Sequence, residues 1–357
     1  MRAAPDVIGP RRSVDRDSSA IEPDEFGALI ARFCPVPNKE PVAVAVSGGG
    51  DSMALALLSA AWARTEGREI RTVTVDHRLR PDSRTEAETV GRWLAGRGIS
   101  HEILSWTDDK PATAIQAAAR DARYRLIGAW ARAKGIRYVF LGHQLEDQAE
   151  TLLMRLARDS GIAGLAAMRG MSERDGLRLC RPLLTVPRAR LRSSLRNAGQ
   201  IWIEDPSNES PKFARTSYRR LATALEDLGA GAQHLSAIAD SFARLDGLMD
   251  AAVRRFLGEV GVWSSDGSLS LPRSSYAALP EPLAASVLRR ALVAIGGAAQ
   301  APRLDRLVRA QERLAKEDGR VAFTLGYCRV ATEGDSIRIR PELGRIPKSF
   351  RRLPIAI

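Results

Sequence analysis

Between residues 41 and 143, short apolar segments alternate with stretches of helical periodicity. The apolar segments, which are typical of buried strands, are residues 41–47, 70–76, 100–106 and 138–143, and the helical stretches lie near residues 52–65, 84–97 and 112–134. Near-continuous apolar strands separated by helices predict an α/β fold, a parallel sheet with helices on both faces. Ligands of such sheets bind beyond the carboxyl ends of the strands, where Ser47, Asp76 and His143 stand.

The chain changes character after the turn-rich segment 205–212. The segments that follow are predicted helices at 215–257, with one Gly-rich interruption, and near 280–295 and 302–316, and β-like segments at 268–273 and 322–340. We therefore predict a second, mostly helical domain with a short C-terminal β segment. The predicted parts of the chain are a disordered extension at 1–25, an α/β domain at 26–214 and the helical domain at 215–357.

The chain is basic, with 54 lysines and arginines against 42 acidic residues and a net charge of +12. Only six of the 54 are lysine, so most of the positive charge is carried by arginine. Arginine binds phosphate groups in a bidentate manner, and this composition would suit a polyanionic partner. A GC-rich coding bias also raises arginine and alanine together, and composition leaves both explanations open. No apolar run approaches the roughly 18 residues of a membrane span. The three cysteines form no CxxC pair, so we expect a cytoplasmic protein without a membrane partner.

One glycine-rich loop follows the first predicted strand and opens a helix: Ser47, Gly48, Gly49, Gly50, Asp51 and Ser52. Glycines let backbone amides approach a phosphate, and the helix N-terminus adds unpaired N–H groups and partial positive charge. Asp51 would repel a bare phosphate, which indicates a Mg²⁺ between the two. The loop is neither a Walker A loop nor a dinucleotide fingerprint. A structural glycine-rich turn with an acidic residue at the helix start is the alternative.

This loop resembles the pyrophosphatase loop of the N-type ATP pyrophosphatases, which cleave ATP between the α and β phosphates and adenylate a substrate. Four further blocks resemble the tRNA(Ile)-lysidine synthases. They are residues 75–83 (VDHRLRPDS), 119–124 (ARDARY), 141–151 (LGHQLEDQAET), and 205–208 (DPSN) with 213–215 (FAR). The five blocks keep the family's order and spacing from about residue 41 to 220.

The sequence departs from the family's pattern at three places. Glu146 stands where the family usually has a second Asp, and Asp159 stands where a Gly is usual. Thr216 and Ser217 replace an Asn-Arg pair. The first change keeps the charge, whereas the last weakens any role assigned near residue 216.

The resemblance implies a ligase that uses ATP and Mg²⁺. ATP would adenylate the C2 oxygen of the wobble cytidine in the isoleucine tRNA with a CAU anticodon. The ε-amine of free L-lysine would then displace AMP, giving lysidine and switching codon reading from AUG to AUA. Residues 26–214 would be the catalytic domain and residues 215–357 a tRNA-binding domain.

The resemblance and the residues together suggest a set of site residues. The predicted catalytic residues are Asp51, Arg120, Asp147 and Glu150; the ATP-binding residues are those of the loop from Ser47 to Ser52 and His77; the metal ligand is Asp51; the lysine-binding residues are Asp147 and Glu150; and the tRNA-binding residues are Arg80, Arg123, Arg215 and Arg219.

Each functional role assigned here has a purely structural alternative. Arg120 and Arg123 share a helix face and would clamp phosphates or the adenylated base, or would only be solvated. Asp147 and Glu150 also share a face, and would bind lysine or metal, accept a proton, or merely complement the helix dipole. Glu146 has compatible spacing but departs from the family block.

The basic residues of the second region would contact the tRNA backbone, or simply form solvated helix faces. They include Arg254, Arg255, Arg338 and Arg340.

Three other functions compete with this interpretation. A sulfur-inserting tRNA enzyme would use catalytic cysteines, and Cys34, Cys180 and Cys328 occur in none of the expected motifs. A catalytically inactive tRNA-binding protein would not need the intact loop. An amidotransferase would need a glutaminase domain, which no segment resembles.

Overall fold

The computed structural model describes residues 19–37, 39–111, 113–204, 214–297, 301–316 and 320–342. The chain divides into two compact units. The first comprises the described residues up to Met154 together with Met168–Ile238, and the second comprises Arg155–Ala167 and the described residues from Ala239 onward. Most of the predicted extension at 1–25 lies outside the described residues, but Ile21 is buried and the first helix begins at Pro23.

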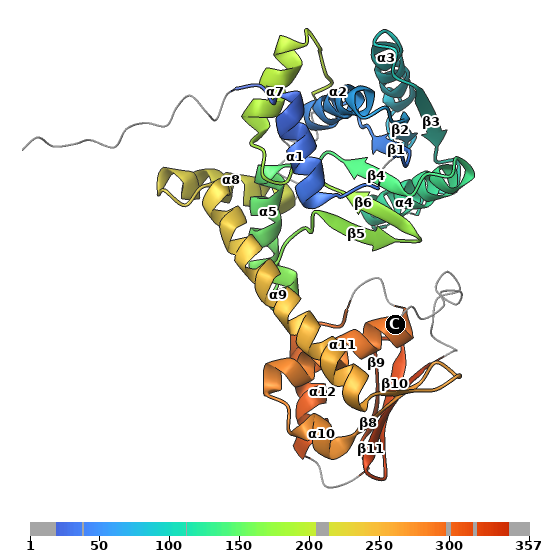
Figure 1. Cartoon of the computed structure of the whole chain (residues 1–357), viewed down its shortest axis with the longest axis vertical. Helices are drawn as coiled ribbons and strands as arrows, with labels where there is room; N and C mark the ends of the chain where they lie inside the picture. The colour runs from blue at the N-terminus through green and yellow to red at the C-terminus, as the bar shows by residue number, and fades with distance from the viewer. Residues whose placement is uncertain are drawn as a thin grey trace, which may run out of the picture. The chain divides into compact units, whose positions relative to one another are not determined.

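The first unit contains a six-stranded sheet in the order β3-β2-β1-β4-β6-β5 (Figure 1). Its strands are β1 (Val42–Ala45), β2 (Ile70–Asp76), β3 (His101–Ser105), β4 (Tyr138–Leu141), β5 (Met171–Arg174) and β6 (Leu177–Cys180). All neighbouring strands are parallel except β5, which runs antiparallel to β6. The central strand β1 pairs with both β2 and β4, so the strand order reverses beside its carboxyl end, where such folds bind ligands.

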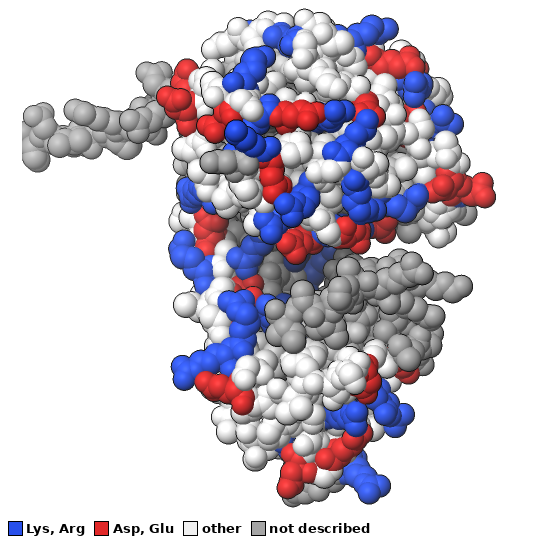
Figure 2. Space-filling view, turned by 45° about the vertical axis from the view of Figure 1, so that its right-hand side comes forward, with Lys and Arg blue, Asp and Glu red and all other residues white. Residues whose placement is uncertain are grey.

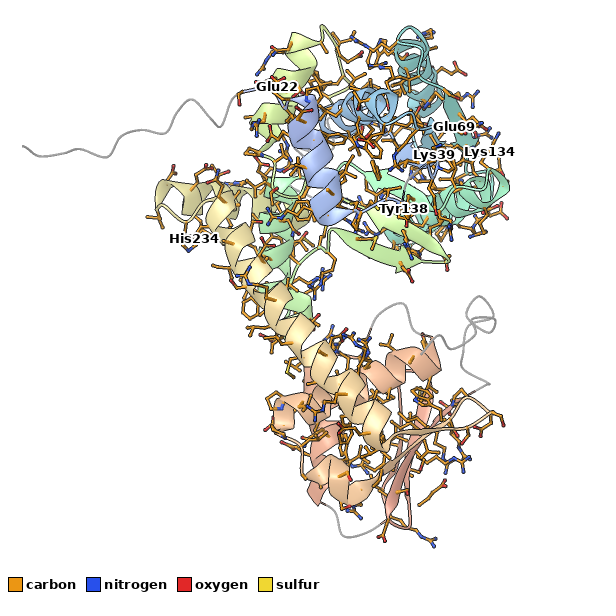
Figure 3. All side chains as sticks on the ribbon, in the orientation of Figure 1. Glu22, Lys39, Glu69, Lys134, Tyr138 and His234 are labelled. Atoms are coloured by element: carbon orange, nitrogen blue, oxygen red, sulfur yellow. The ribbon has the colours of Figure 1, made fainter. Side chains whose placement is uncertain are left out.

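Helices cover both faces of this sheet, because alternate residues of β1 belong to different cores. Val42 and Val44 pack with the apolar residues of α1, α2 and α7, whereas Ala43 packs with those of α4. Tyr138, labelled in Figure 3, is fully buried at the start of β4. The helices of the first unit are α1 (Pro23–Phe33), α2 (Gly50–Thr65), α3 (Ser83–Ala95), α4 (Ile115–Ala133), α5 (Leu145–Leu156, which ends in the second unit), α7 (Arg188–Asn197) and α8 (Ala214–Asp227). The predicted α/β class is confirmed, with an antiparallel edge strand that the sequence analysis did not include.

The second unit has its own core and its own sheet. Its elements are α6 (Ile162–Leu165), most of α9 (Ala232–Val260), β7 (Val262–Trp263), β8 (Leu269–Pro272), α10 (Arg273–Ala277), α11 (Glu281–Gly296), α12 (Leu304–Lys316), β9 (Ala322–Leu325), β10 (Cys328–Glu333) and β11 (Ser336–Pro341). The five strands form an antiparallel sheet in the order β7-β8-β11-β10-β9. Apolar residues alternate with polar ones along β10 and β11, so one face of this sheet packs on the core. The predicted β-like segments at 268–273 and 322–340 therefore belong to one small sheet.

No described helix is long and apolar enough to cross a membrane. The functional division predicted at residue 214 differs in position from the division into compact units, which lies within α9, and it stays a prediction.

Candidate active site

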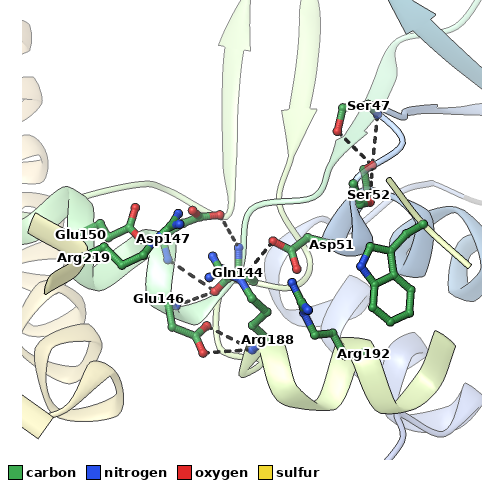
Figure 4. A network of polar contacts seen from close by, with 12 residues as sticks. Ser47, Asp51, Ser52, Gln144, Glu146, Asp147, Glu150, Arg188, Arg192 and Arg219 are labelled. Carbon is green, nitrogen blue, oxygen red and sulfur yellow. Dashed lines mark hydrogen bonds and ion pairs between the residues drawn. The ribbon is translucent and has the colours of Figure 1, made fainter. Parts of the chain in front are cut away.

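The glycine-rich loop closes around the hydroxyl group of Ser52. The Ser47 backbone N–H donates to Ser52 Oγ at 3.1 Å, and Ser52 Oγ donates to the carbonyl of Gly49 at 2.9 Å. The Ser47 and Ser52 hydroxyl oxygens lie 3.1 Å apart (Figure 4). These bonds shape the loop immediately before α2, which begins at Gly50. The helix start is therefore preorganised, and its first backbone N–H groups are available for an anion.

Two glycines make this geometry possible. Gly48 has a φ of +90°, and a Cβ there would lie 2.8 Å from Val90 and 2.9 Å from Ile203. The Ile203 N–H also donates to the Gly48 carbonyl at 2.9 Å. At the end of β4, a Cβ on Gly142 would lie 3.1 Å from the Ser52 backbone. The loop is thus held between its neighbours with no room for a side chain.

Gly48→Ala is expected to destabilise the protein much more than Gly67→Ala. Both glycines have positive φ, but no atom lies within 4 Å of the Cβ position of Gly67. Gly67→Ala, the control, should lower the free energy of unfolding through backbone strain alone, by roughly 1–2 kcal/mol. The change at Gly48 should cost a further ~1–3 kcal/mol from overpacking. Denaturant unfolding of the two variants measures this difference, and equal losses would mean that the loop yields without cost.

Four carboxylates, here called the acidic cluster, interact electrostatically with the guanidinium of Arg188 near the loop. They are Asp51 of α2 and Glu146, Asp147 and Glu150 of α5. Arg188 Nε lies 3.5 Å from Asp51 Oδ2 (Figure 4). Burial disfavours the charged form of this guanidinium, but the acidic cluster raises the pKa of Arg188 above its ordinary value. Burial raises the pKa of Asp51, and Arg188 opposes that shift.

Asp147 closes the first turn of α5. The Gln144 N–H donates to Asp147 Oδ2 at 3.2 Å, and Gln144 Oε1 accepts the backbone N–H groups of Glu146 at 2.5 Å and Asp147 at 3.4 Å. This reciprocal arrangement is a capping box. Asp147 is also buried. The capping bonds orient its carboxylate, so the structural and functional interpretations of this residue are compatible.

Glu146 links α5 to α7. Both of its carboxylate oxygens accept the Arg188 backbone N–H at 3.1 Å. An acid at a helix N-terminus satisfies an otherwise unpaired donor and complements the helix dipole. Burial raises the pKa of Glu146. This contact holds Arg188 beside the loop.

Glu150 is paired with Arg219. Its side chain is only 1% exposed, and its Oε1 accepts a hydrogen bond from Arg219 Nε of α8 at 2.9 Å. The structure thus brings together one residue predicted to bind lysine and one predicted to bind tRNA.

A second, basic group of predicted residues lies on α4 and at the end of β2. The guanidinium carbons of Arg120 and Arg123 lie 5.3 and 5.7 Å from the ring centroid of Tyr124. Burial lowers the pKa of Arg123, and the charge of Arg120 adds to this effect. Burial also lowers the pKa of His77, as does the neighbouring Arg123, and the His77 ring stands edge-on to Trp106 at 6.1 Å. The predicted residues therefore form an acidic and a basic group.

One predicted tRNA contact, Arg80, falls outside both groups. Arg80 is exposed and forms an ion pair with Glu86 at 2.8 Å. The backbone of Arg215 belongs to α8, but its side chain lies outside the described part of the structure. The block at 205–208 and Phe213 lie entirely outside the described residues.

Sequence reasoning missed Arg188 and Gln144. A signal for Arg188 existed, because it begins a helix directly after Pro187, and a cation at a helix N-terminus is unfavourable unless acids surround it. Gln144 at a predicted helix start, three residues before Asp147, also fits a capping pattern.

The residues of this site could hold a magnesium ion only if substrate phosphates supplied the remaining donor atoms. Among the described residues, no group of three or more His, Cys, Asp or Glu side chains could hold a metal ion. Mg²⁺ is usually held by one or two carboxylates together with substrate phosphates. Asp51, in the first turn of α2 beside the loop, matches that donor set.

Known proteins resemble this chain in sequence and in fold. Residues 24–225 match the PP-loop domain family. The tRNA(Ile)-lysidine synthase of Bradyrhizobium sp. (strain BTAi1) is 41% identical over 330 residues, covering 87% of this chain and 92% of the relative. The enzyme of the same name from Bradyrhizobium diazoefficiens is 37% identical over 359 residues, covering 94% and 99%.

Among solved structures, the U34-tRNA thiolase NcsA from Methanococcus maripaludis has a TM-score of 0.53 at 16% identity, covering 62% of this chain and 78% of that one. This likeness concerns the fold alone. The identities with the curated relatives extend over nearly their full lengths. The chain therefore belongs to the tRNA(Ile)-lysidine synthase family and carries its PP-loop domain.

Proposed function

We propose that this chain ligates L-lysine to C2 of the wobble cytidine in the isoleucine tRNA with a CAU anticodon. The observation that carries the proposal is the preorganised loop next to the acidic cluster, one member of which, Asp51, pairs with Arg188. Membership of the lysidine synthase family indicates the reaction. The acidic cluster and the basic group on α4 and at the end of β2 would meet its electrostatic requirements.

In the first step, the C2 oxygen of the cytidine attacks the α-phosphorus of ATP and pyrophosphate leaves. Backbone N–H groups at the start of α2 would bind the phosphates, and Asp51 would hold Mg²⁺. The ion would offset phosphate charge when bound. Arg120 and Arg123 carry positive charge with no carboxylate partner among the described residues, which suits the transferring phosphate.

In the second step, the lysine ε-amine attacks C2 and AMP leaves. A free amine has a pKa near 10.4, so a proton must be lost around the time of attack. Asp147 and Glu150 are buried acids on one face of α5 and would hold the ammonium group or accept that proton. Arg219 already satisfies one of them, so lysine must compete with this arginine for Glu150.

The thiols weigh against the sulfur-inserting alternative. Cys34, Cys180 and Cys328 are all buried. The neighbouring Cys180 and burial raise the pKa of the Cys34 thiol far above its ordinary value, and burial raises the pKa of Cys328 to about 12. Protonated, buried thiols are poor nucleophiles. The cytoplasmic location stays a prediction.

The direct test is an omission experiment with purified protein. With ATP, Mg²⁺ and the isoleucine tRNA but no lysine, adenylated tRNA should accumulate together with one equivalent of pyrophosphate. Adding lysine should convert it to lysidine and release AMP. A requirement for a sulfur donor in place of lysine would instead support the rival thiolation reaction.

The affinity for tRNA should fall steeply with salt. If at least four phosphates are contacted, raising salt from 50 to 200 mM should weaken binding by roughly 100-fold, because counterion release scales with the contacts formed. Filter binding at several salt concentrations gives the slope. The Kd for lysine, a small single-site ligand, serves as the internal control and should change far less.

A further inference from the structure

Several exposed arginines of this chain pair with neighbouring acids. Arg254 pairs with Asp250 at 3.2 Å, and Arg255 pairs with Glu259 at 2.8 Å. Figure 2 likewise shows blue and red side chains interspersed over the face that it draws. Such surface pairs contribute little stability and indicate no function by themselves. An arginine with a function must therefore be recognised by its surroundings.

Arg188 is distinguished by its place at the start of α7. Its side chain is only 24% exposed, and Glu146 accepts its backbone N–H. Two other helices begin close to it. Asp51 in the first turn of α2 lies 3.5 Å away, and the N–H of Leu145, the first residue of α5, donates to the Val186 carbonyl at 3.1 Å. A cation at the positive end of a helix is unfavourable, so the stability of α7 does not explain this placement.

The guanidinium of Arg188 has donors to spare. Its Nε lies 3.5 Å from Asp51 Oδ2 (Figure 4), and within the described ranges the guanidinium donates no hydrogen bond. Arg192, one turn further along α7, differs in this respect, because it donates to both carboxylate oxygens of Glu204 at 2.9 and 3.5 Å. Arg188 can therefore bind an anion without breaking a hydrogen bond of its own.

The only close acidic partner of Arg188 among the described residues, Asp51, is also the proposed metal ligand. A metal ion bound to this carboxylate would repel the guanidinium beside it. An anion that contacts both cations would remove this repulsion. In the proposed reaction the β- and γ-phosphates of ATP, next to the loop, are such an anion.

We propose that Arg188 binds the β- and γ-phosphates of ATP, and that Asp51 and these phosphates compete for its guanidinium; this inference rests on the proposed function. Guanidinium groups bind phosphate oxygens in pairs. When the cytidine oxygen bonds to the α-phosphorus, the bond from that phosphorus to the bridging oxygen breaks and its electron pair stays on pyrophosphate. Arg188 stabilises the negative charge that develops on this leaving group.

The α-carboxylate of lysine is the other anion that could reach Arg188. The ion pair of Arg188 favours the phosphates, because its partner Asp51 belongs to the glycine-rich loop. Asp147 and Glu150, the acids predicted to bind lysine, influence Arg188 only through longer-range electrostatics among the described residues.

The test measures ligand binding without tRNA or lysine, so that no nucleophile is present. Arg188→Gln is compared with Arg196→Gln, which removes the same charge from the same helix. Arg196 is exposed, donates to Ser193 at 3.2 Å and lies eight residues, ~12 Å, further along α7. Calorimetric titration with Mg²⁺ gives the Kd values of ATP, pyrophosphate and AMP. Arg188→Gln should raise those of ATP and pyrophosphate roughly tenfold or more and change that of AMP less than about twofold, whereas Arg196→Gln should change none of them.

Two results would overturn the proposal. Equal weakening of ATP and AMP by Arg188→Gln would show that Arg188 only holds α7 against α2. Unchanged binding of ATP and pyrophosphate, with a raised Kd for lysine, would assign Arg188 to the carboxylate of the amino acid.

The competition between Asp51 and phosphate gives a second test, with EDTA in place of Mg²⁺. Asp51→Asn should bind pyrophosphate more tightly than the wild type, because it removes the competitor. In Asp51→Asn/Arg188→Gln most of this gain should disappear, and such non-additivity measures the coupling. The double variant leaves no carboxylate without its partner, so it also serves if Arg188→Gln alone fails to fold. A gain that persists in full in the double variant would refute the competition.

The outcome is separable from that of the proposed function. Formation of lysidine by the wild-type protein, with ATP, tRNA and lysine, tests the reaction alone. If lysidine is absent but Arg188→Gln still separates ATP from AMP, the proposed reaction is wrong and the role of Arg188 stands. If lysidine forms and the variant binds ATP normally, only the role of Arg188 is wrong.

Discussion

Asp51→Asn is expected to reduce tRNA-dependent pyrophosphate release by roughly 100- to 1000-fold, the range typical for loss of one preorganised electrostatic group. Asparagine keeps the shape of the side chain but cannot supply the negative charge that a metal ion requires from a ligand. The affinity for tRNA should stay within about twofold of the wild type, because the change removes no cation that contacts phosphate. Initial rates over a Mg²⁺ titration measure the effect.

The matched control for this variant is Asp108→Asn. Asp108 is exposed, pairs with Arg125 and is not a member of the acidic cluster, so the same loss of charge there should leave the rate nearly unchanged. The fold should also survive the change at Asp51. Burial raises the pKa of Asp51. A carboxyl group whose pKa is raised on folding lowers the stability of the fold as the pH rises above the ordinary pKa of that group. Normal turnover of Asp51→Asn at saturating Mg²⁺ would refute the assigned role.

Glu150→Gln is expected to raise the KM for lysine by roughly tenfold or more, while adenylated tRNA accumulates when lysine is limiting. The change removes a charge-assisted partner of the ammonium group, worth roughly 1.5–3 kcal/mol, and each ~1.4 kcal/mol corresponds to a factor of ten. Adenylation of the cytidine does not involve lysine and should continue. Steady-state kinetics over a lysine titration measures both effects.

Arg219→Gln provides the complementary variant, because Arg219 is the cation now bound to Glu150 at 2.9 Å. Removing this competitor should lower the KM for lysine, even though removing one member of a buried ion pair makes the fold less stable. If Glu150 serves only to anchor α8 through Arg219, both variants should lower the melting temperature and neither should change the KM for lysine. Loss of adenylation in Glu150→Gln would move Glu150 to the ATP side of the site.

Several elements could be predicted because their signals are local. Strand β2 was predicted at its observed bounds, and α2 within two residues of its start. Runs of apolar residues and glycines at element boundaries are patterns of neighbouring residues, so they can be recognised without the fold. Strands β5 and β6 are short and partly polar and were not predicted. The pairing of β6 with β4 is long-range. The pairing of β5 with β6 is a local hairpin around Asp175 and Gly176, and this Asp-Gly turn is a signal that the sequence analysis did not use.

The sequence by itself determined the α/β class, the loop from Ser47 to Ser52 and the family. Glycine conformations, helix starts and motif order depend on residues that are adjacent in the chain. Only the tertiary structure decided that Arg188 pairs with Asp51 and that Arg219 pairs with Glu150. Each of these contacts joins residues that the chain separates by about ten positions or more. Their charges interact only after packing removes them from water and fixes their distances, and a linear sequence carries neither quantity.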